Sequence, residues 1–176
     1  EIPNIDLYMD QVTTFMDEHF SSTKRYTEDK ILTKTMINNY TKNNLLPPSV
    51  KKKYSREHML LLILIYYFKN ILSIKDIETV LEPLREKYFS TDSALQLSDI
   101  YREVCEMEKS RIEPMKASVR EAYGKSQSSF ENVPDGEEKD KLQLFTFICS
   151  LSFDVYLKKM MIEKIVDELA SKDKKE

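Results

Sequence analysis

Two adjacent asparagines, Asn38 and Asn39, are the side chains whose type and spacing most clearly suggest a chemical task. An Asn amide both donates and accepts hydrogen bonds, so it can pair with the edge of an adenine in the major groove of DNA. Thr35 precedes them by about one helical turn and can contact a thymine methyl group or a phosphate. The competing interpretation of these residues is an exposed polar face without a partner.

Basic side chains flank the asparagines on both sides. The segment 24–58 holds nine Lys and Arg against three Asp and Glu, a net charge of +6, whereas the whole chain carries −3 and the remainder therefore −9. A basic segment on an acidic protein is typical of a surface that holds a polyanion. Phosphate contacts position a protein on DNA without reading its sequence. The candidates for such contacts are Lys34, Lys42, Lys51, Lys52, Lys53 and Arg56.

A short helix must position the asparagines. Thr33 is a favourable N-cap, and apolar residues recur behind it at helical spacing, which predicts a helix over 33–43 with one buried stripe. Asn43-Asn44 suits a left-handed C-cap, and Pro47-Pro48 prevents the helix from continuing. The inward residues are Met36, Ile37 and Tyr40, and the outward ones are Lys34, Thr35, Asn38, Asn39, Thr41 and Lys42.

The elements around this helix follow from the same patterns. Asp6 is the expected N-cap of an amphipathic helix over about 7–20, and residues 21–30 read as a loop. Residues 51–54 are expected to be extended. Ser55 then caps a helix that is apolar nearly all round and therefore forms the centre of the core. Ser73 caps a further helix over 74–82, with Ile74, Ile77, Val80 and Leu81 inward and Pro83 at its end.

The C-terminal part reads as a helical hairpin. Residues 85–96 are expected to be a linker, followed by apolar residues at helical spacing over 97–123, where Pro114 predicts a kink or two abutting helices. A polar segment over 125–139 contains the turn Pro134-Asp135-Gly136, and a last helix is expected over about 140–171. This antiparallel hairpin carries more apolar surface than two helices bury, so we expect another module or a second subunit to cover it.

Only two glycines in 176 residues favour an all-α fold, because turns in sheets commonly require Gly. Three stretches then resemble the MerR-type winged helix-turn-helix. Residues 36–48, MINNYTKNNLLPP, are similar to its T-I-R-Y-Y-E-x-x-G-L-L-P-P, residues 52–58 to its Y-R-x-Y region, and residues 71–77 to its G-F-S-L-x-E-I. Asn38 stands where an Arg is usual, and the short span from Pro48 to Tyr54 leaves little or no wing.

The phrases IDLYMDQV, LTKTMINNYTK and KKYSREH, taken together, resemble more closely a bacterial family of unassigned function, domain of unknown function 1836. This resemblance covers most of residues 2–84 and implies no activity. Together the two resemblances imply an N-terminal MerR-like DNA-binding module over 1–84 and a C-terminal helical module over 85–176 for dimerisation or regulation.

Catalytic and metal sites are not predicted. Of the two histidines, His19 falls on the expected inward stripe of its helix, and His58 lies in the basic segment, where a phosphate contact or solvent exposure is the favoured interpretation. No Walker motif, serine elbow or metal-ligand spacing occurs in the sequence. Cys105 and Cys149 read as reduced, buried side chains of a cytoplasmic protein. The longest apolar run, 59–68, is about half of a membrane span.

The sequence thus predicts a cytoplasmic, sequence-specific transcription regulator that binds double-stranded DNA as a homodimer without a cofactor. A non-catalytic adaptor built on the same scaffold is the alternative, although an adaptor has no need of the basic segment. A small-molecule effector could bind among apolar residues of the hairpin, for which core packing is the favoured interpretation. Those residues are Tyr101, Met107, Met115, Phe145, Phe153 and Tyr156.

Overall fold

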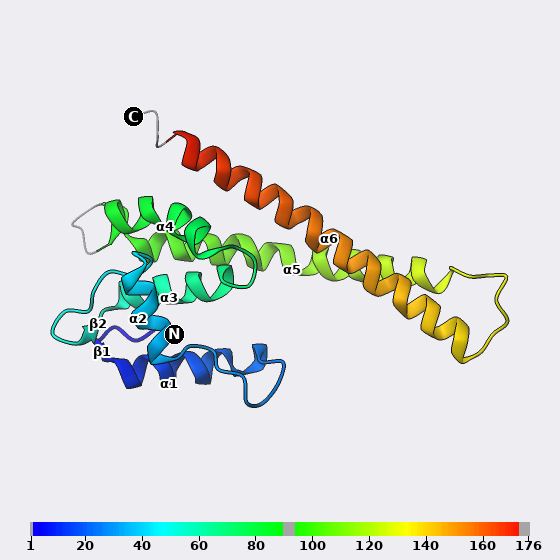
Figure 1. The fold of residues 1–176 in the computed structure, drawn as a ribbon, viewed down its shortest axis with the longest axis horizontal. Coiled ribbons are helices and arrows are strands. Elements are labelled where there is room, and N and C mark those ends of the chain that lie inside the picture. The colour runs from blue at the N-terminus through cyan, green and yellow to red at the C-terminus, as the bar shows by residue number, and fades with distance from the viewer. Residues whose placement is uncertain (1, 90–93, 173–176) are drawn as a thin grey trace. The chain divides into compact units, whose positions relative to one another are not determined.

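The computed structural model describes residues 2–89 and 94–172, and helices make up most of it, as the all-α prediction expected (Figure 1). The chain divides into two compact units. The first unit comprises Glu1–Arg102 and Val166–Glu176, and the second comprises Glu103–Ile165. The elements are β1 (Leu7–Tyr8), α1 (Met9–Phe20), the 3-10 turn η1 (Ser21–Thr23), α2 (Lys34–Lys42), β2 (Lys53–Tyr54), α3 (Arg56–Phe68), α4 (Ile74–Tyr88), α5 (Leu97–Gln127) and α6 (Glu137–Lys172).

Helix α3 is the centre of the first unit, as its sequence predicts. Every side chain from His58 to Ile63 is at most 3% exposed. Burying one Leu, Ile or Met side chain contributes about 1.5–3 kcal/mol, so this helix supplies a large share of the unit's stability. Its N-terminus is capped where expected, because the Ser55 backbone N–H donates to His58 Nδ1 at 3.0 Å.

Helix α1 begins two residues later than predicted, and Asp6 is not its cap. Leu7 and Tyr8 instead form β1, which pairs antiparallel with β2, so that Leu7 faces Tyr54 and Tyr8 faces Lys53. Tyr8 becomes the N-cap, and its backbone N–H donates to Gln11 Oε1 at 2.8 Å. Pairing with a distant strand outweighs the local preference for helix at these two residues.

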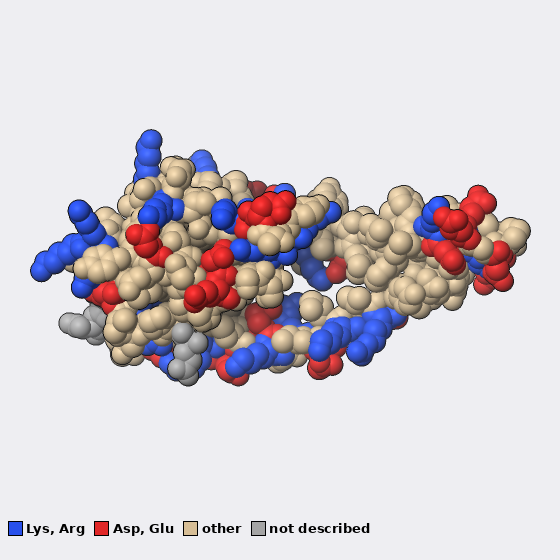
Figure 2. Space-filling view, turned by 90° about the horizontal axis from the view of Figure 1, so that it is seen from below, with Lys and Arg blue, Asp and Glu red and all other residues tan. Residues whose placement is uncertain are grey.

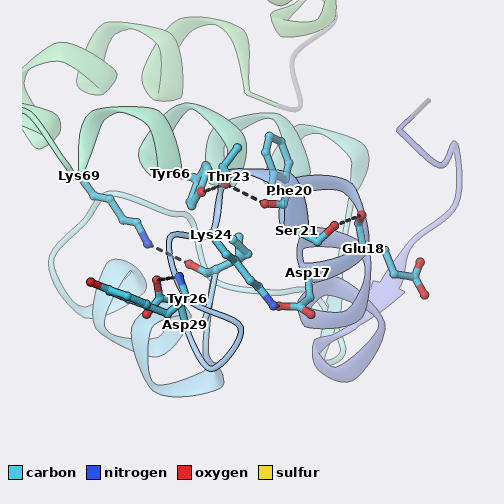
Figure 3. Close-up of polar contacts among 11 residues, drawn as sticks. Asp17, Glu18, Phe20, Ser21, Thr23, Lys24, Tyr26, Asp29, Tyr66 and Lys69 are labelled. Carbon is cyan, nitrogen blue, oxygen red and sulfur yellow. Dashed lines mark hydrogen bonds and ion pairs between the residues drawn. The ribbon is translucent and has the colours of Figure 1, made fainter.

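Side chains tie the loop between α1 and α2 to its neighbours (Figure 3). Lys24 forms an ion pair with Asp17 of α1 at 2.7 Å. The hydroxyl of Thr23 bonds that of Tyr66 on α3, and Lys69 Nζ donates to the Ile31 carbonyl at 2.9 Å. Burial lowers the pKa of Lys69. These contacts fix the predicted loop over 21–30 and hence the start of α2.

Helix α4 continues past Pro83 to Tyr88, so the predicted end at residue 82 is wrong. A proline lacks one N–H and therefore breaks a single intrahelical bond, which packing on both sides can offset. Ile77 and Leu81 are fully buried as predicted, but Ile74 is exposed. The predicted linker over 85–96 therefore begins within this helix, and residues 90–93 lie outside the described residues.

The second unit consists of the paired parts of α5 and α6, a hairpin as predicted (Figure 1). Helix α5 runs through Pro114 as one helix, and α6 begins at Glu137, three residues earlier than expected. At the turn, Gln143 Nε2 donates to the carbonyls of Gln127 and Ser129 at 2.7 and 3.1 Å. Gly136, at a φ of 151°, completes the predicted turn.

Candidate nucleic-acid interface

Helix α2 presents the two asparagines on its outer side. The Thr33 hydroxyl accepts from the Met36 backbone N–H at 3.1 Å, which confirms the predicted N-cap. Ile37 and Tyr40 anchor the opposite side at 0% and 6% exposure, and burial raises the pKa of the Tyr40 hydroxyl. A short helix whose apolar stripe packs on the core can place its polar face in a groove of DNA while this packing stays intact.

The polar face of α2 is uncommitted within the described part of the chain. Thr35, Asn38, Asn39 and Lys42 are exposed, and their side chains form no hydrogen bond or ion pair with residues 2–89 or 94–172. Asn39 contributes only its backbone carbonyl, which accepts from the Asn43 side chain at 2.8 Å. Donors and acceptors in this state remain available to a ligand from solution.

Contacts through α1 bring the start of α2 close to the strand β2. Lys34 forms an ion pair with Asp10, in the first turn of α1. Lys53 Nζ lies 5.2 Å from the ring centroid of Tyr8, which directly precedes α1. Lys34 and Lys53 therefore flank the same end of α1, whereas Lys42 lies about 12 Å further along α2. Asp10 offsets part of the positive charge at Lys34.

A two-residue hairpin turn between Val50 and Lys53 leads into β2. The Val50 and Lys53 backbones exchange hydrogen bonds of 3.0 and 2.9 Å, with Lys51 and Lys52 between them at φ of 51° and 64°. Positive φ at both central residues is the type I′ turn, which favours Asn-Gly and strains a lysine. The prediction of an extended 51–54 is thus wrong for Lys51 and Lys52. Among the described residues between Pro48 and Tyr54, this turn is the segment that could act as a wing.

Arg56 and His58, close in sequence, have opposite environments. Arg56 is exposed in the first turn of α3, directly after β2. His58 is 2% exposed, its Nε2 lies 3.4 Å from the Pro48 carbonyl, and it packs edge-on against Phe89. Burial lowers the pKa of His58, opposed by its bonds to backbone carbonyls. The expectation that His58 contacts phosphate or solvent is therefore wrong, because the Ser55 cap draws the ring inward.

The sequence expectations for His19 and for the two cysteines are wrong, because none of these side chains is fully buried. His19 is exposed and stacks on Phe15 at 4.0 Å between ring centroids, so it is not a core residue. Cys149 is exposed and Cys105 half-buried, and both are free thiols. Among the residues that the structure describes, no group of three or more His, Cys, Asp or Glu side chains could hold a metal ion, and no helix is long and apolar enough to cross a membrane.

All nine predicted contact residues lie in the first unit, and eight are exposed, with Lys53 half-buried. Sequence reasoning missed the role of Tyr8 as the ring beneath Lys53, because no local pattern reveals a strand partner 45 residues away. It also missed the left-handed turn. A signal for that turn existed, since Val50 and Lys53 bracket a two-residue connection, but Lys-Lys lacks the usual Asn-Gly signature.

These features define a class: a helical protein in which a short capped helix presents a polar face near a basic hairpin turn. Residues 1–104 match the family described as Domain of unknown function (DUF1836), and the chain belongs to this family. The predicted membership is confirmed, and the match extends beyond the expected residue 84. No curated protein and no solved structure matches the chain.

Proposed function

We propose that this protein is a sequence-specific, DNA-binding transcription regulator of the MerR-like type, acting in the cytoplasm. The observation that carries the proposal is the uncommitted polar face of α2, with Asn38 and Asn39 exposed and free of internal partners within the described residues. Such a face, on a helix anchored by Ile37 and Tyr40, fits the major groove.

Each candidate residue has a distinct role in this proposal. Asn38 and Asn39 pair with adenine edges, and Thr35 contacts a thymine methyl group or a phosphate. Lys34, Lys42 and Arg56 hold the phosphate backbone on either side of the groove. The hairpin turn acts as a minimal wing, and its lysines contact neighbouring phosphates of the DNA backbone; these lysines are Lys51, Lys52 and Lys53. The strain at Lys51 and Lys52 is typical of functional positions.

The second unit serves dimerisation in this proposal. Two copies bind two half-sites of an operator with matching two-fold symmetry. Helices α5 and α6 also offer apolar side chains to which a small-molecule effector could bind. A non-catalytic adaptor is the second candidate function, and the exposed apolar side chains of α6 favour it.

The deciding experiment is fluorescence anisotropy with a labelled mixed-sequence duplex between about 50 and 200 mM salt. Six to ten phosphate contacts should reduce affinity by about 10³–10⁵-fold over a range of this kind. We expect micromolar or tighter binding at low salt, and a steep loss with added salt. Absence of binding at about 100 µM protein contradicts the regulator and leaves the adaptor.

A charge-matched pair of variants assigns the surface. Lys51→Ala/Lys52→Ala/Lys53→Ala should weaken binding to every sequence and flatten the salt dependence, since each lost phosphate contact lowers the slope by about one. The control, Lys116→Ala/Lys125→Ala/Lys141→Ala, removes the same charge from exposed positions of the second unit. Equal losses in both variants would mean that only net charge matters and would contradict the assignment.

A further inference from the structure

The second unit exposes far more apolar surface than it covers. Its two most deeply buried side chains are both polar, Ser126 at 3% and Gln143 at 5% exposure. The described large apolar side chains that are 38–65% exposed in this unit are Val104, Met107, Ile112, Met115, Val119, Tyr123, Phe130, Leu144, Phe145, Ile148, Phe153, Val155, Tyr156, Leu157, Met160, Met161 and Ile165. The hairpin therefore lacks an apolar core within one chain.

The contacts between the two paired helices lie in the half of the hairpin that is nearer the turn. Tyr123 packs edge-on against Phe147 at 5.3 Å, and Gln143 bonds to the end of α5. Beyond these contacts, every residue from 106 to 121 on α5 and from 152 to 161 on α6 is exposed. The exposed surfaces of α5 and α6 in these two stretches are therefore open to a further pair of helices.

Helix α6 is apolar on several sides over 142–157, where Asp154 is the single charged residue. Leu144, Phe145 and Ile148 lie on one part of this stretch and Phe153, Val155 and Tyr156 on another, all exposed. A helix that is apolar all round is normally buried on most sides. One neighbouring helix cannot provide that cover, whereas the interior of a four-helix bundle can.

Charge on the unit is already balanced. Residues 103–165 hold ten Lys and Arg against twelve Asp and Glu, a net charge of −2. Pairs three or four residues apart neutralise each other along each helix, such as Lys116 with Glu113, Lys125 with Glu121 and Lys158 with Asp154. The covering surface therefore needs to be apolar and close to neutral, which is the character of this unit itself. Broad areas without charged side chains extend from the charged turn (Figure 2).

The exposed apolar area is sufficient for a stable dimer. Seventeen side chains, each about half exposed, amount to on the order of 1,500 Å², since a large side chain offers roughly 200 Å². A stable interface takes about 800 Å² from each partner. The parts of α5 and α6 inside this unit, residues 103–127 and 137–165, are about 38 and 44 Å long, which provides the length for such an interface.

We infer that two copies of this chain associate through the hairpin 103–165, forming a four-helix bundle whose core is the apolar residues that one chain leaves exposed. A two-fold axis uses the same surface on both copies, so no second type of apolar partner is needed. The choice of a second copy as the occupant rests on the proposed function, because two half-sites require two DNA-binding units.

Sedimentation equilibrium of the full chain, without DNA, tests the inference. We expect twice the chain mass of 20.8 kDa at about 10 µM protein. Phe145→Glu/Phe153→Glu should reduce it to one chain, because it places four charges per dimer in the bundle core. Both residues are more than 60% exposed in the single chain, so the variant leaves the fold of the first unit intact.

The matched control is Ile5→Glu/Tyr26→Glu, which adds the same charges at exposed apolar positions of the first unit and should remain a dimer. A single-chain mass up to about 100 µM, any other assembly, or a dimer that survives Phe145→Glu/Phe153→Glu would overturn the inference. The two proposals fail separately. A dimer that binds no duplex contradicts the DNA-binding function and leaves the bundle, whereas a monomer that binds DNA contradicts dimerisation through the hairpin and leaves DNA binding by the first unit.

Discussion

At the scale of single residues, the candidate nucleic-acid interface depends on side chains of α2 that make no hydrogen bond or ion pair with the described residues. Ile37 and Tyr40 anchor the helix in the core, and Thr33 caps it. The asparagine side chains form no hydrogen bond or ion pair with the described residues, so their replacement should leave the stability of the fold unchanged. Substitutions on this face therefore test binding with little risk of unfolding the protein, because the replaced side chains form no internal hydrogen bonds.

Asn38→Ala and Asn39→Ala test base reading. Each should reduce the preference for the selected operator over a scrambled duplex by about 1–3 kcal/mol, or roughly 5- to 150-fold, because one bidentate contact to adenine is lost. Binding to the scrambled duplex should stay within about twofold. Competition anisotropy with both duplexes measures the ratio, and an unchanged ratio in both variants would remove these residues from the reading surface.

His58→Gln tests the buried imidazole. Burial lowers the pKa of His58, so the folded state binds its proton less readily than the unfolded state. The stability from this group is complete above about pH 6.5, the unfolded value, and is lost as pH falls from there toward the folded pKa. The melting temperature of the wild type should therefore fall further between pH 7 and pH 5 than that of the variant.

Gln at this position keeps an acceptor for the Ser55 backbone N–H, as in a common capping box, but does not titrate. Circular-dichroism melts at both pH values give the comparison. Identical losses in the two proteins would show that His58 is not the source of the pH dependence.

At the scale of elements, the hairpin turn before β2 shows a conflict between stability and charge. Lys51 and Lys52 occupy left-handed positions that each cost a non-glycine residue about 1 kcal/mol or more. Lys51→Asn/Lys52→Gly supplies the residues that a type I′ turn favours. It should raise the free energy of unfolding by on the order of 1 kcal/mol, and weaken duplex binding about tenfold or more at low salt.

Urea denaturation and anisotropy on the same preparation measure both effects. Lys51→Asn alone separates them further, because it removes one charge and relieves only the first position. A stabilised variant with full affinity would mean that the two lysines do not contact DNA.

The elements also show how far sequence patterns reach. Caps at Thr33, Ser55 and Ser73 were predictable, because each pairs with a residue three positions further along the chain. The strand at Leu7 and Tyr8 was not, since its partner strand, Lys53–Tyr54, is distant in the sequence and no local pattern links the two. Among the candidate contact residues, exposure followed from helical periodicity, whereas the ion pair of Lys34 with Asp10 and the turn at Lys51 depended on tertiary packing.

At the scale of the whole molecule, assembly should govern stability. If the hairpin gains its core only in the dimer, dissociation and unfolding are coupled, and the melting temperature rises with protein concentration. Melts of the full chain from about 1 to 100 µM should show an upward shift, and Phe145→Glu/Phe153→Glu should abolish it. A concentration-independent wild type would indicate that the hairpin is stable by itself.

Cys149 makes it possible to measure how fast two copies of the chain separate. Its thiol is exposed on α6 in the single chain, among the apolar residues that the bundle would enclose. A thiol reagent in excess would then reach it only when two copies separate, so the labelling rate equals the rate of subunit exchange. That rate would set whether a dimer exchanges its subunits within one cell division or keeps the same two copies together.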